Sequence, residues 1–210
     1  MSPLPEQSIV YVVDDDPALR RSLRFLLESV GWKVQLFASA AEFLPVASVL
    51  TQPCCLLLDI RMPGMSGLEL QQILHERAFA VPILFMTGHA DVSMAVQAMK
   101  SGACDFIEKP FNDQKVLDAV TAAVRRCVEV LDEAQRRDVA HLSLTTLSPR
   151  EREVARLVAL GRPNKLIASA LDISEKTVHI HRQHVMEKAG ISSAAELARL
   201  MLRANPDALD

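Results

Sequence analysis

No segment of this chain is apolar for long enough to cross a membrane as a helix. The longest apolar run, residues 78–86, has nine residues and contains Pro82, whereas a membrane-spanning helix needs about 20 apolar residues. The opening residues, MSPLPEQ, include neither the basic segment nor the apolar segment of a signal peptide. We therefore expect no membrane partner and a cytoplasmic location.

Cysteine is also scarce, with four residues at positions 54, 55, 104 and 127. Their spacing is not that of a metal site, and their number is too low for a disulfide-rich secreted domain. We expect them to be buried thiols in a reducing cytosol.

Apolar residues are plentiful, at 50% of the 210 residues, which is enough for one large domain or two small ones. Charge is distributed unevenly. Residues 1–142 contain 13 Lys and Arg against 18 Asp and Glu, a balance of −5, and residues 143–203 contain 10 against 6, a balance of +4. This split favours two separate tasks, the second of them on a polyanion.

The first part of the chain is organised around the stretch CCLLLDIRMPG, residues 54–64. Five apolar residues lead directly to Asp59, and Pro63 and Gly64 end the run, a pattern typical of a buried parallel strand. Open α/β sheets gather their ligand groups at the carboxyl ends of the strands. Because a buried carboxylate needs a cation or hydrogen-bond donors, we expect Asp59 to have partners there.

Strands and helices alternate around this stretch. The pattern predicts helices at 17–30, after Ser39, at 66–77 and at 90–101, and short apolar strands at 8–13, 33–37, 54–59, 82–86 and 104–107. Five strands that alternate with helices predict an α/β fold with a doubly wound, five-stranded parallel sheet.

Such a sheet gathers polar side chains at one edge, because each follows a strand: Asp14, Asp15, Asp59, Thr87 and Lys109. Magnesium takes hard oxygen ligands and keeps some water, so carboxylates and a phosphate oxygen can hold it. Asp59 is then free to act as a nucleophile that accepts a phosphoryl group. Lys109 and Mg²⁺ would offset charge on the phosphoryl oxygens, and Thr87 would donate a hydrogen bond to one of them.

A helical pattern begins near Asn112 and continues unusually far, with apolar residues at alternating spacings of three and four from Leu117 to Ala134. Two interpretations remain open. The helix can form a coiled-coil seam of fewer than about three heptads, or it can pack its first half on the sheet and continue as a linker, which we favour. Residues 142–147 carry no helix cap, and we place the boundary there.

The last third is predicted to be an all-α, four-helix unit with helices that open at Ser148, Pro163, Ser174 and Ser193. Its second and third helices, joined by a tight turn, fit a helix-turn-helix. On the third helix, 175–189, we expect one face in the core, with His181 near it, packed and hydrogen-bonded. The opposite face suits the major groove of DNA. The residues expected to contact bases or phosphates are Lys165, Lys176, Thr177, His179, Ile180, Arg182 and Gln183.

Several motifs give the chain a family resemblance: VVDDD at 12–16, LLLDIRMPGMSG at 56–67, MTGHAD at 86–91 and FIEKPF at 106–111. At these spacings the first part resembles a CheY-like receiver domain. Residues 147–200 resemble the LuxR-type DNA-binding domain, so the whole chain resembles a response regulator of the NarL/FixJ family. The overall likeness extends to regulators of aromatic-hydrocarbon breakdown, although no single residue specifies that group.

The resemblance implies site residues. Asp15, Asp59 and the carbonyl of Arg61 would bind magnesium with Asp14 assisting, Phe106 would be the switch aromatic, and the Lys109-Pro110 bond would be cis. It also implies a receiver domain at 1–124, a helical linker at 125–146 and a DNA-binding domain at 147–210. The expected function is that of a two-component response regulator. A cognate histidine kinase would phosphorylate Asp59, and the resulting homodimer would bind double-stranded DNA to control transcription.

Some residues depart from the family pattern, and two other interpretations compete. His179 and Gln183 stand where the family often has basic residues, so no base preference can be transferred. A phosphatase of the haloacid-dehalogenase type would have a second Asp two residues after the nucleophile, where this chain has Arg61, and the helix-turn-helix would be unexplained. We therefore expect a regulator and not an enzyme. The other interpretation, DNA binding without phosphorylation, would leave Asp59 unlabelled by small acyl phosphates.

Overall fold

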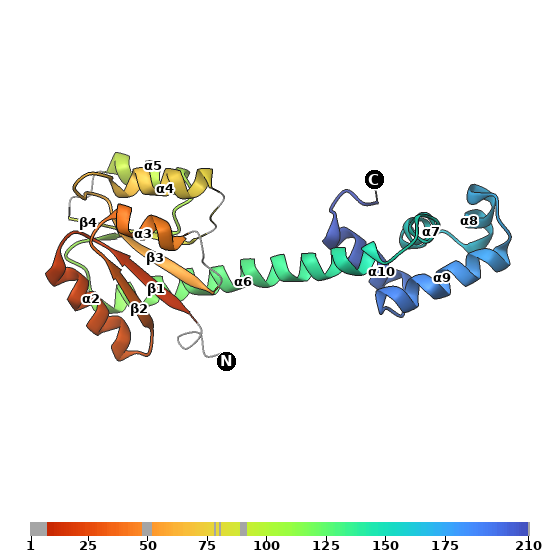
Figure 1. Ribbon diagram of the computed structural model, residues 1–210, viewed down its shortest axis with the longest axis horizontal. Coiled ribbons are helices and arrows are strands. Elements are labelled where there is room, and N and C mark those ends of the chain that lie inside the picture. The colour runs from red at the N-terminus through yellow and green to blue at the C-terminus, as the bar shows by residue number, and fades with distance from the viewer. Residues whose placement is uncertain (1–7, 48–51, 78, 80, 89–91, 210) are drawn as a thin grey trace. The chain divides into compact units, whose positions relative to one another are not determined.

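The computed structural model describes residues 8–47, 52–77, 79, 81–88 and 92–209, and the chain divides into two compact units, Met1–Leu131 and Asp132–Asp210. The first unit has a parallel sheet with helices on both faces, and the second is helical (Figure 1), which confirms the predicted fold class. The helix start predicted at Ala90 and the His89-Ala90-Asp91 part of one motif lie outside the described residues.

The sheet has five parallel strands in the order β2-β1-β3-β4-β5. The chain leaves β1 on one side to form β2 and returns on the other to form β3, so the reversal of strand order falls at β1, where open α/β sheets form their sites. Val13 of β1 is paired with Leu58 of β3, which brings Asp14 and Asp59 to neighbouring positions at the carboxyl edge. The strands are β1 Ile9–Val13, β2 Lys33–Phe37, β3 Cys54–Asp59, β4 Ile83–Thr87 and β5 Asp105–Glu108.

Helices cover both faces of the sheet, as Figure 1 shows. One face is covered by α2 (Pro17–Ser29) and the first part of α6 (Asp113–Thr145), the other by α3 (Ala40–Ala47), α4 (Gly67–Glu76) and α5 (Val92–Lys100). The central strand β3 is buried along its whole length, with alternate residues in the two cores. Burial on both faces is the reason why its sequence is a continuous apolar run rather than an alternating one.

Local sequence signals fix where the helices next to the site begin. The side chain of Asp16 accepts a hydrogen bond from the amide of Ala18, with Pro17 at the first helical position of α2. At α4, the Ser66 hydroxyl and the Glu69 carboxylate form a complete capping box. The two caps hold the ends of the loops that follow β1 and β3.

The second unit contains α7 (Pro149–Ala159), α8 (Asn164–Leu171), α9 (Glu175–Ala189) and α10 (Ala194–Ala204), together with the end of α6. Its core includes Val154, Ile167, Val178, Val185 and Leu197. The turn between α8 and α9 begins at Asp172, which adopts a left-handed conformation with φ of 52°. This short turn produces the predicted helix-turn-helix.

Helix α6 continues through Thr145, so the boundary expected at 142–147 is helical for most of its length. Val120, Val124 and Cys127 of the predicted coiled-coil seam are buried within the first unit. A coiled coil would need these side chains to be exposed to a second helix. The helix instead packs its first half on the sheet, which is the other of the two interpretations. No helix in the described part of the chain is long and apolar enough to cross a membrane.

Candidate functional site

A cluster of carboxylates lies at the carboxyl edge of the sheet. One side-chain oxygen from each of Asp14, Asp15 and Asp59 can be chosen so that all lie within 4.8 Å of one another. Asp14 directly follows β1 and is 1% exposed, Asp59 ends β3 and is 7% exposed, and Asp15 is open to solvent. Within the described part of the chain, this is the one group of three or more His, Cys, Asp or Glu side chains close enough to share a metal ion.

Lys109 connects two of these carboxylates. Its Nζ donates a hydrogen bond to Asp14 Oδ2 at 2.7 Å and to Asp59 Oδ1 at 3.0 Å. The amide of Lys109 donates to the carbonyl of Thr87 at 2.7 Å, which holds the loop after β5 against the end of β4. The Lys109-Pro110 peptide bond is cis, as the sequence resemblance predicted.

The environment shifts the protonation equilibria of this pair. Burial, followed by the nearby charges of Asp14 and Asp15, raises the pKa of Asp59, although Lys109 partly counteracts this rise. Burial favours the neutral form of Lys109, but its bonds to Asp14 and Asp59 outweigh that effect and raise its pKa. The ammonium is therefore charged at neutral pH, and Asp59 has a more basic carboxylate than an exposed Asp.

Three other predicted site residues occupy the same edge or the strands beside it. Thr87 is the last residue of β4 and is buried, and the register pairs the preceding residue with Asp59. Phe106 lies on β5, half-buried against the apolar core and paired with Phe85. Arg61 lies in the loop after β3 with an exposed side chain.

Sequence reasoning missed two residues that support the carboxylates. Arg20 Nη1 donates a hydrogen bond to the carbonyl of Asp14 at 2.6 Å, from one turn into α2. Gly67, at the start of α4, packs so tightly that a Cβ atom there would lie 2.2 Å from the carbonyl oxygen of Asp59. A glycine directly after a capping serine was the available signal for this close approach.

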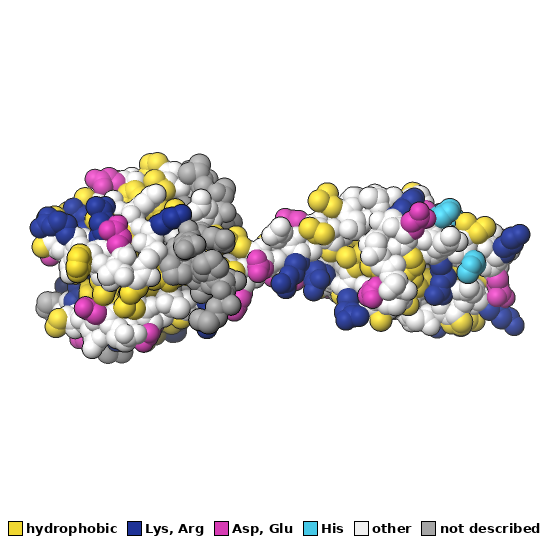
Figure 2. All heavy atoms as spheres, turned by 90° about the horizontal axis from the view of Figure 1, so that it is seen from below, with side chains coloured by type: hydrophobic (Ala, Val, Ile, Leu, Met, Phe, Trp, Pro, Cys, Tyr) yellow, Lys and Arg dark blue, Asp and Glu magenta, His cyan; other side chains and the backbone are white. Residues whose placement is uncertain are grey.

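In the second unit, α9 separates a buried face from an exposed one. Val178 and Val185 are buried, whereas Lys176, His179, Ile180 and Gln183 are exposed, as is Lys165 on α8. Figure 2 shows Lys, Arg and His side chains on a face of this unit.

Two of the residues predicted to contact DNA are engaged within the protein. The Thr177 hydroxyl lies 2.8 Å from Ser174 Oγ in the N-terminal cap of α9. Arg182 Nη1 donates to Asn164 Oδ1 at 2.8 Å, and so connects α9 to the start of α8. His181 was expected to be hydrogen-bonded, but its Nδ1 is buried with no partner among the described residues, so the prediction is wrong for that atom.

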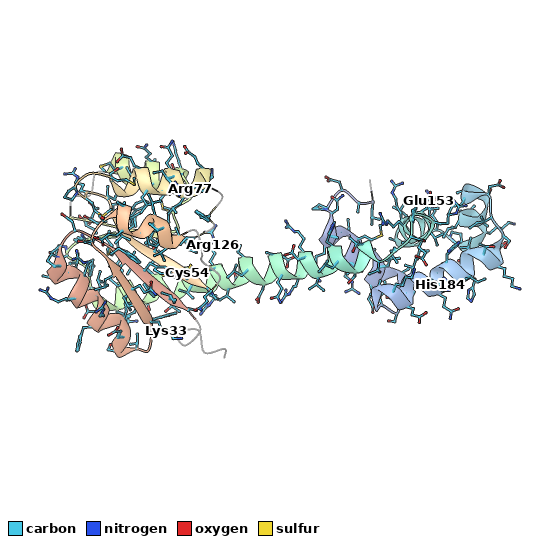
Figure 3. All side chains as sticks on the ribbon, in the orientation of Figure 1. Lys33, Cys54, Arg77, Arg126, Glu153 and His184 are labelled. Atoms are coloured by element: carbon cyan, nitrogen blue, oxygen red, sulfur yellow. The ribbon has the colours of Figure 1, made fainter. Side chains whose placement is uncertain are left out.

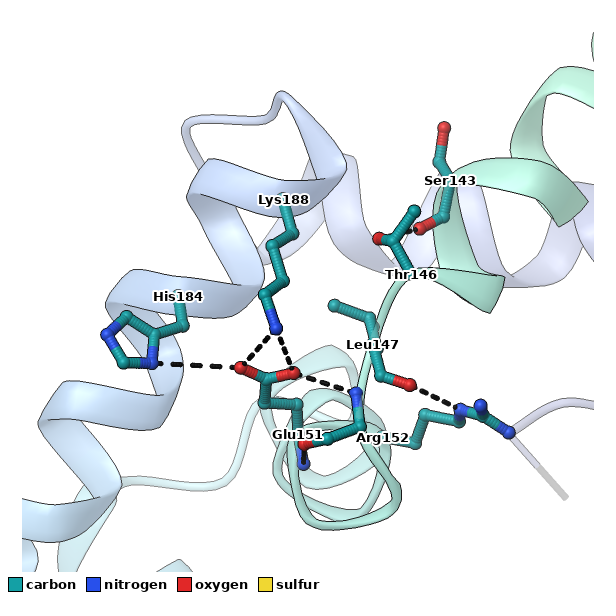
Figure 4. A network of polar contacts seen from close by, with 8 residues as sticks. Ser143, Thr146, Leu147, Glu151, Arg152, His184 and Lys188 are labelled. Atoms are coloured by element: carbon teal, nitrogen blue, oxygen red, sulfur yellow. Dashed lines mark hydrogen bonds and ion pairs between the residues drawn. The ribbon is translucent and has the colours of Figure 1, made fainter.

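A buried carboxylate network fastens α7 to α9 (Figure 4). Glu151 is 4% exposed, and its two oxygens accept hydrogen bonds from Lys188 Nζ at 2.9 and 2.7 Å. Glu151 Oε2 also accepts from the amide of Ser148 at 2.7 Å, which completes a capping box, and His184 Nδ1 lies 3.7 Å from Oε1. The sequence predicted the cap but not Lys188.

Comparison with known proteins agrees with this architecture. Residues 10–121 match the family described as the response regulator receiver domain, and residues 145–201 match the bacterial regulatory proteins of the luxR family. Nodulation protein W of Bradyrhizobium diazoefficiens is 48% identical over 92% of this chain and 85% of its own length. The response regulator protein TodT of Pseudomonas putida is 42% identical over 93% of this chain and 86% of its own.

Solved structures give the same result. The response regulator StyR aligns with a TM-score of 0.82 at 41% identity, over 92% of this chain and 98% of its own. Full-length FixJ from B. japonicum aligns with a TM-score of 0.59 at 42% identity, over 94% of this chain and 97% of its own. A receiver domain followed by a LuxR-type DNA-binding domain defines a two-component response regulator that controls transcription. The chain belongs to the NarL/FixJ family of these regulators.

Proposed function

We propose that Asp59 is the phosphoryl acceptor of this regulator and that a phosphohistidine of its cognate kinase is the donor. The observation that carries the proposal is a carboxylate at the end of a buried strand, hydrogen-bonded to Lys109 and close to two further carboxylates. An Asp59 oxygen would attack phosphorus while the phosphorus–nitrogen bond of the donor breaks, leaving an acyl phosphate on Asp59 and a neutral histidine on the kinase after protonation. Lys109 would offset charge on the transferred oxygens.

Magnesium fits the residues present. Asp14, Asp15 and Asp59 offer hard oxygen ligands close together, and we assign the carbonyl of Arg61 to the same set. When bound there, Mg²⁺ supplies positive charge opposite the phosphoryl oxygens. The protein's own contribution is to hold the Asp14 and Asp59 carboxylates through Lys109 and the Asp14 backbone through Arg20.

We further propose that phosphorylation is read by Thr87 and Phe106 and leads to a homodimer. Thr87 would donate to the new phosphoryl group, and Phe106 would move into the space that Thr87 leaves. The dimer face would be α5 with β5, because these elements flank both residues. Val96 and Met99 on α5 are each 46% exposed, an apolar surface that a second copy would cover.

For DNA binding we propose that α9 enters the major groove. His179, Ile180 and Gln183 would face base edges, and Lys165, Lys176, Thr177 and Arg182 would contact phosphates or support the base readers. We keep the receiver domain at 1–124, the linker at 125–146 and the DNA-binding domain at 147–210. Because the DNA that this regulator would bind lies in the cytoplasm, we assign the chain to the cytoplasm. We propose that it acts as a regulator and not as an enzyme.

Labelling with a phosphodonor tests the central step. The full chain is incubated with Mg²⁺ and acetyl phosphate, and acid-labile phosphate is measured by intact-protein mass spectrometry. Asp59→Asn should lose the added phosphoryl mass, Asp15→Asn should label more slowly, and Asp105→Asn, an exposed Asp on β5, should label like the wild type. Full labelling of Asp59→Asn would refute the assignment, and absent labelling of the wild type would favour DNA binding without phosphorylation.

A further inference from the structure

Two of the four cysteines meet at the edge of the sheet opposite to Asp59. Cys54 begins β3 and Cys127 lies on α6, 73 positions apart in the sequence. The backbone N–H of Cys54 donates a hydrogen bond to Cys127 Sγ at 3.4 Å. Both side chains belong to the same apolar cluster, with exposed fractions of 3% and 4%. The pairing is therefore built into the packing of the first unit.

The position of the pair gives it a structural consequence. Cys54 and Asp59 are the two ends of one strand, separated by roughly 17 Å at 3.3 Å per residue. Cys127 is the last buried side chain of α6 in the first unit, since Glu129, Val130 and Leu131 beyond it are exposed. Figure 3 labels Cys54 at the start of β3 and Arg126 on α6. A covalent bond at this point would fasten α6 where it leaves the core of the sheet.

The other two cysteines do not share this arrangement. Cys55 belongs to the core on the opposite face of the sheet. Cys104, next to β5, is half-buried and lies 3.9 Å from Arg126 Nη1. Within the described residues, no group of three metal-ligating side chains includes a cysteine. The Cys54 and Cys127 pair is thus suited to two-thiol chemistry rather than to a metal ion.

The two thiols are also chemically unequal. Hydrogen bonds from the side chain and the backbone N–H of Cys54 lower the pKa of Cys127. The same side-chain hydrogen bond, together with burial, raises the pKa of Cys54. Cys127 is therefore the first of the pair to become a thiolate, and the thiolate is the form that reacts with oxidants. Cys54 remains protonated beside it, in position to act as the second, resolving thiol.

We propose that Cys54 and Cys127 form an oxidation-sensitive dithiol, which a hydroperoxide converts into a disulfide between β3 and α6. The Cys127 thiolate attacks the O–O bond of hydrogen peroxide, takes up one oxygen to become a sulfenic acid, and releases hydroxide, which is protonated to water. The Cys54 sulfur then displaces the sulfenic oxygen as a second water. One peroxide is reduced, two thiols are oxidised, and one S–S bond forms. In a cytosolic protein such a bond is transient and reports redox state.

Peptide mapping of the full chain tests this proposal. The reduced protein is exposed to hydrogen peroxide for increasing times, remaining thiols are blocked with N-ethylmaleimide, and the protein is digested with trypsin without reduction. Cleavage places the cysteines on three separate peptides: 34–61 with Cys54 and Cys55, 101–115 with Cys104, and 127–136 with Cys127. We expect a linked 34–61 and 127–136 species, at least tenfold more abundant than any species linked to 101–115 and removed by dithiothreitol.

Variants identify the partner within the 34–61 peptide. Cys54→Ser and Cys127→Ser should abolish the linked species, whereas Cys55→Ser and Cys104→Ser should keep it. Oxidation should also raise the unfolding midpoint, followed by Trp32 fluorescence, by several degrees in the wild type and in Cys104→Ser but not in Cys127→Ser. Free thiols at 54 and 127 throughout the time course, or a dominant link to Cys104, would overturn the proposal. The wild-type map gives this answer even where a variant fails to fold.

Discussion

Replacing Glu151 by Gln should destabilise the DNA-binding unit and leave the receiver unit unchanged. The substitution keeps the size of the side chain and its ability to accept a hydrogen bond from the Ser148 amide. It removes the negative charge that faces Lys188 at 2.7 Å. The change therefore isolates the charge within the network that connects α7 to α9.

The size of the effect follows from the pKa of Glu151. Its bonds to Lys188 and to the Ser148 amide lower the pKa from 4.5 to about 2. At about 1.4 kcal/mol per pH unit, the ionised form stabilises the fold by at most about 3 kcal/mol. The Lys188 side chain is 42% exposed, so solvent screens the pair and we expect a loss of about 1–2 kcal/mol. In a unit of this size the loss lowers the unfolding midpoint by roughly 5–10 °C.

The chain carries its own internal control for this measurement. Its single Trp, Trp32, is buried in the first unit, so fluorescence follows receiver unfolding, whereas far-UV circular dichroism also follows the helices of the second unit. Glu151→Gln should move a dichroism transition and not the fluorescence transition. Glu153→Gln, on the same helix and 51% exposed, should move neither by more than about 0.5 kcal/mol.

The pH dependence gives the result that would refute the reasoning. A carboxylate whose pKa is lowered on folding contributes all of its stability above the unfolded pKa of 4.5 and loses it as the pH falls toward about 2. The difference between the wild type and Glu151→Gln should therefore be present at pH 7 and at pH 5, where His184, 3.7 Å from Glu151 Oε1, can add to it when charged, and should be smaller at pH 3.5 than at pH 5. A difference that is absent at pH 7, or that is larger at pH 3.5 than at pH 5, would show that the ionised Glu151 is not stabilising.

Four further predictions concern the receiver unit. Asp59→Asn should raise the free energy of unfolding at pH 7, because a raised Asp59 pKa means that the charge of Asp59 opposes folding. Urea titrations should show that this gain in stability shrinks as the pH falls toward 3.8. A variant less stable than the wild type at pH 7 would contradict the prediction. Gly67→Ala should destabilise the unit by more than about 1 kcal/mol, because the added Cβ would lie 2.2 Å from the Asp59 carbonyl oxygen. The control Gly88→Ala should unfold in urea near the wild-type midpoint, because a Cβ at Gly88 has no atom within 4 Å. Thr87→Ala should be labelled by acetyl phosphate yet gain little DNA affinity, and activation equal to that of the wild type would disprove the coupling. Beryllofluoride should double the mass measured by light scattering. Met99→Asp, on the proposed dimer face, should prevent this doubling, whereas Leu131→Asp should not. A wild-type chain that stays monomeric with beryllofluoride would refute the dimer.

The sequence was sufficient for the features that depend on local pattern. The strand at 54–59 was predicted because burial on both faces requires an uninterrupted apolar run. The helix at 175–189 was predicted because Ser174 caps its start. The cluster of Asp14, Asp15 and Asp59 followed from the topology, since parallel strands share one carboxyl edge.

Features that depend on distant packing were not predictable in the same way. The bond from Lys188 to Glu151 joins residues 37 positions apart, and the contact between Cys54 and Cys127 joins residues 73 apart. Neither pair has a spacing that an amphipathic pattern can reveal.

Charge balance at the sheet edge explains why a hydroxyl belongs to the proposed switch. The three carboxylates carry −3 and Lys109 carries +1, which leaves −2, the charge that a bound divalent cation neutralises. Phosphorylation would replace the single charge of Asp59 by about two, so the site would become negative by about one. Two of the three N–H donors of Lys109 already bond to Asp14 and Asp59, so the third can serve only one of the phosphoryl oxygens. The other phosphoryl oxygens would need a further hydrogen-bond donor, and we propose that Thr87, the last residue of the adjacent strand β4, provides it.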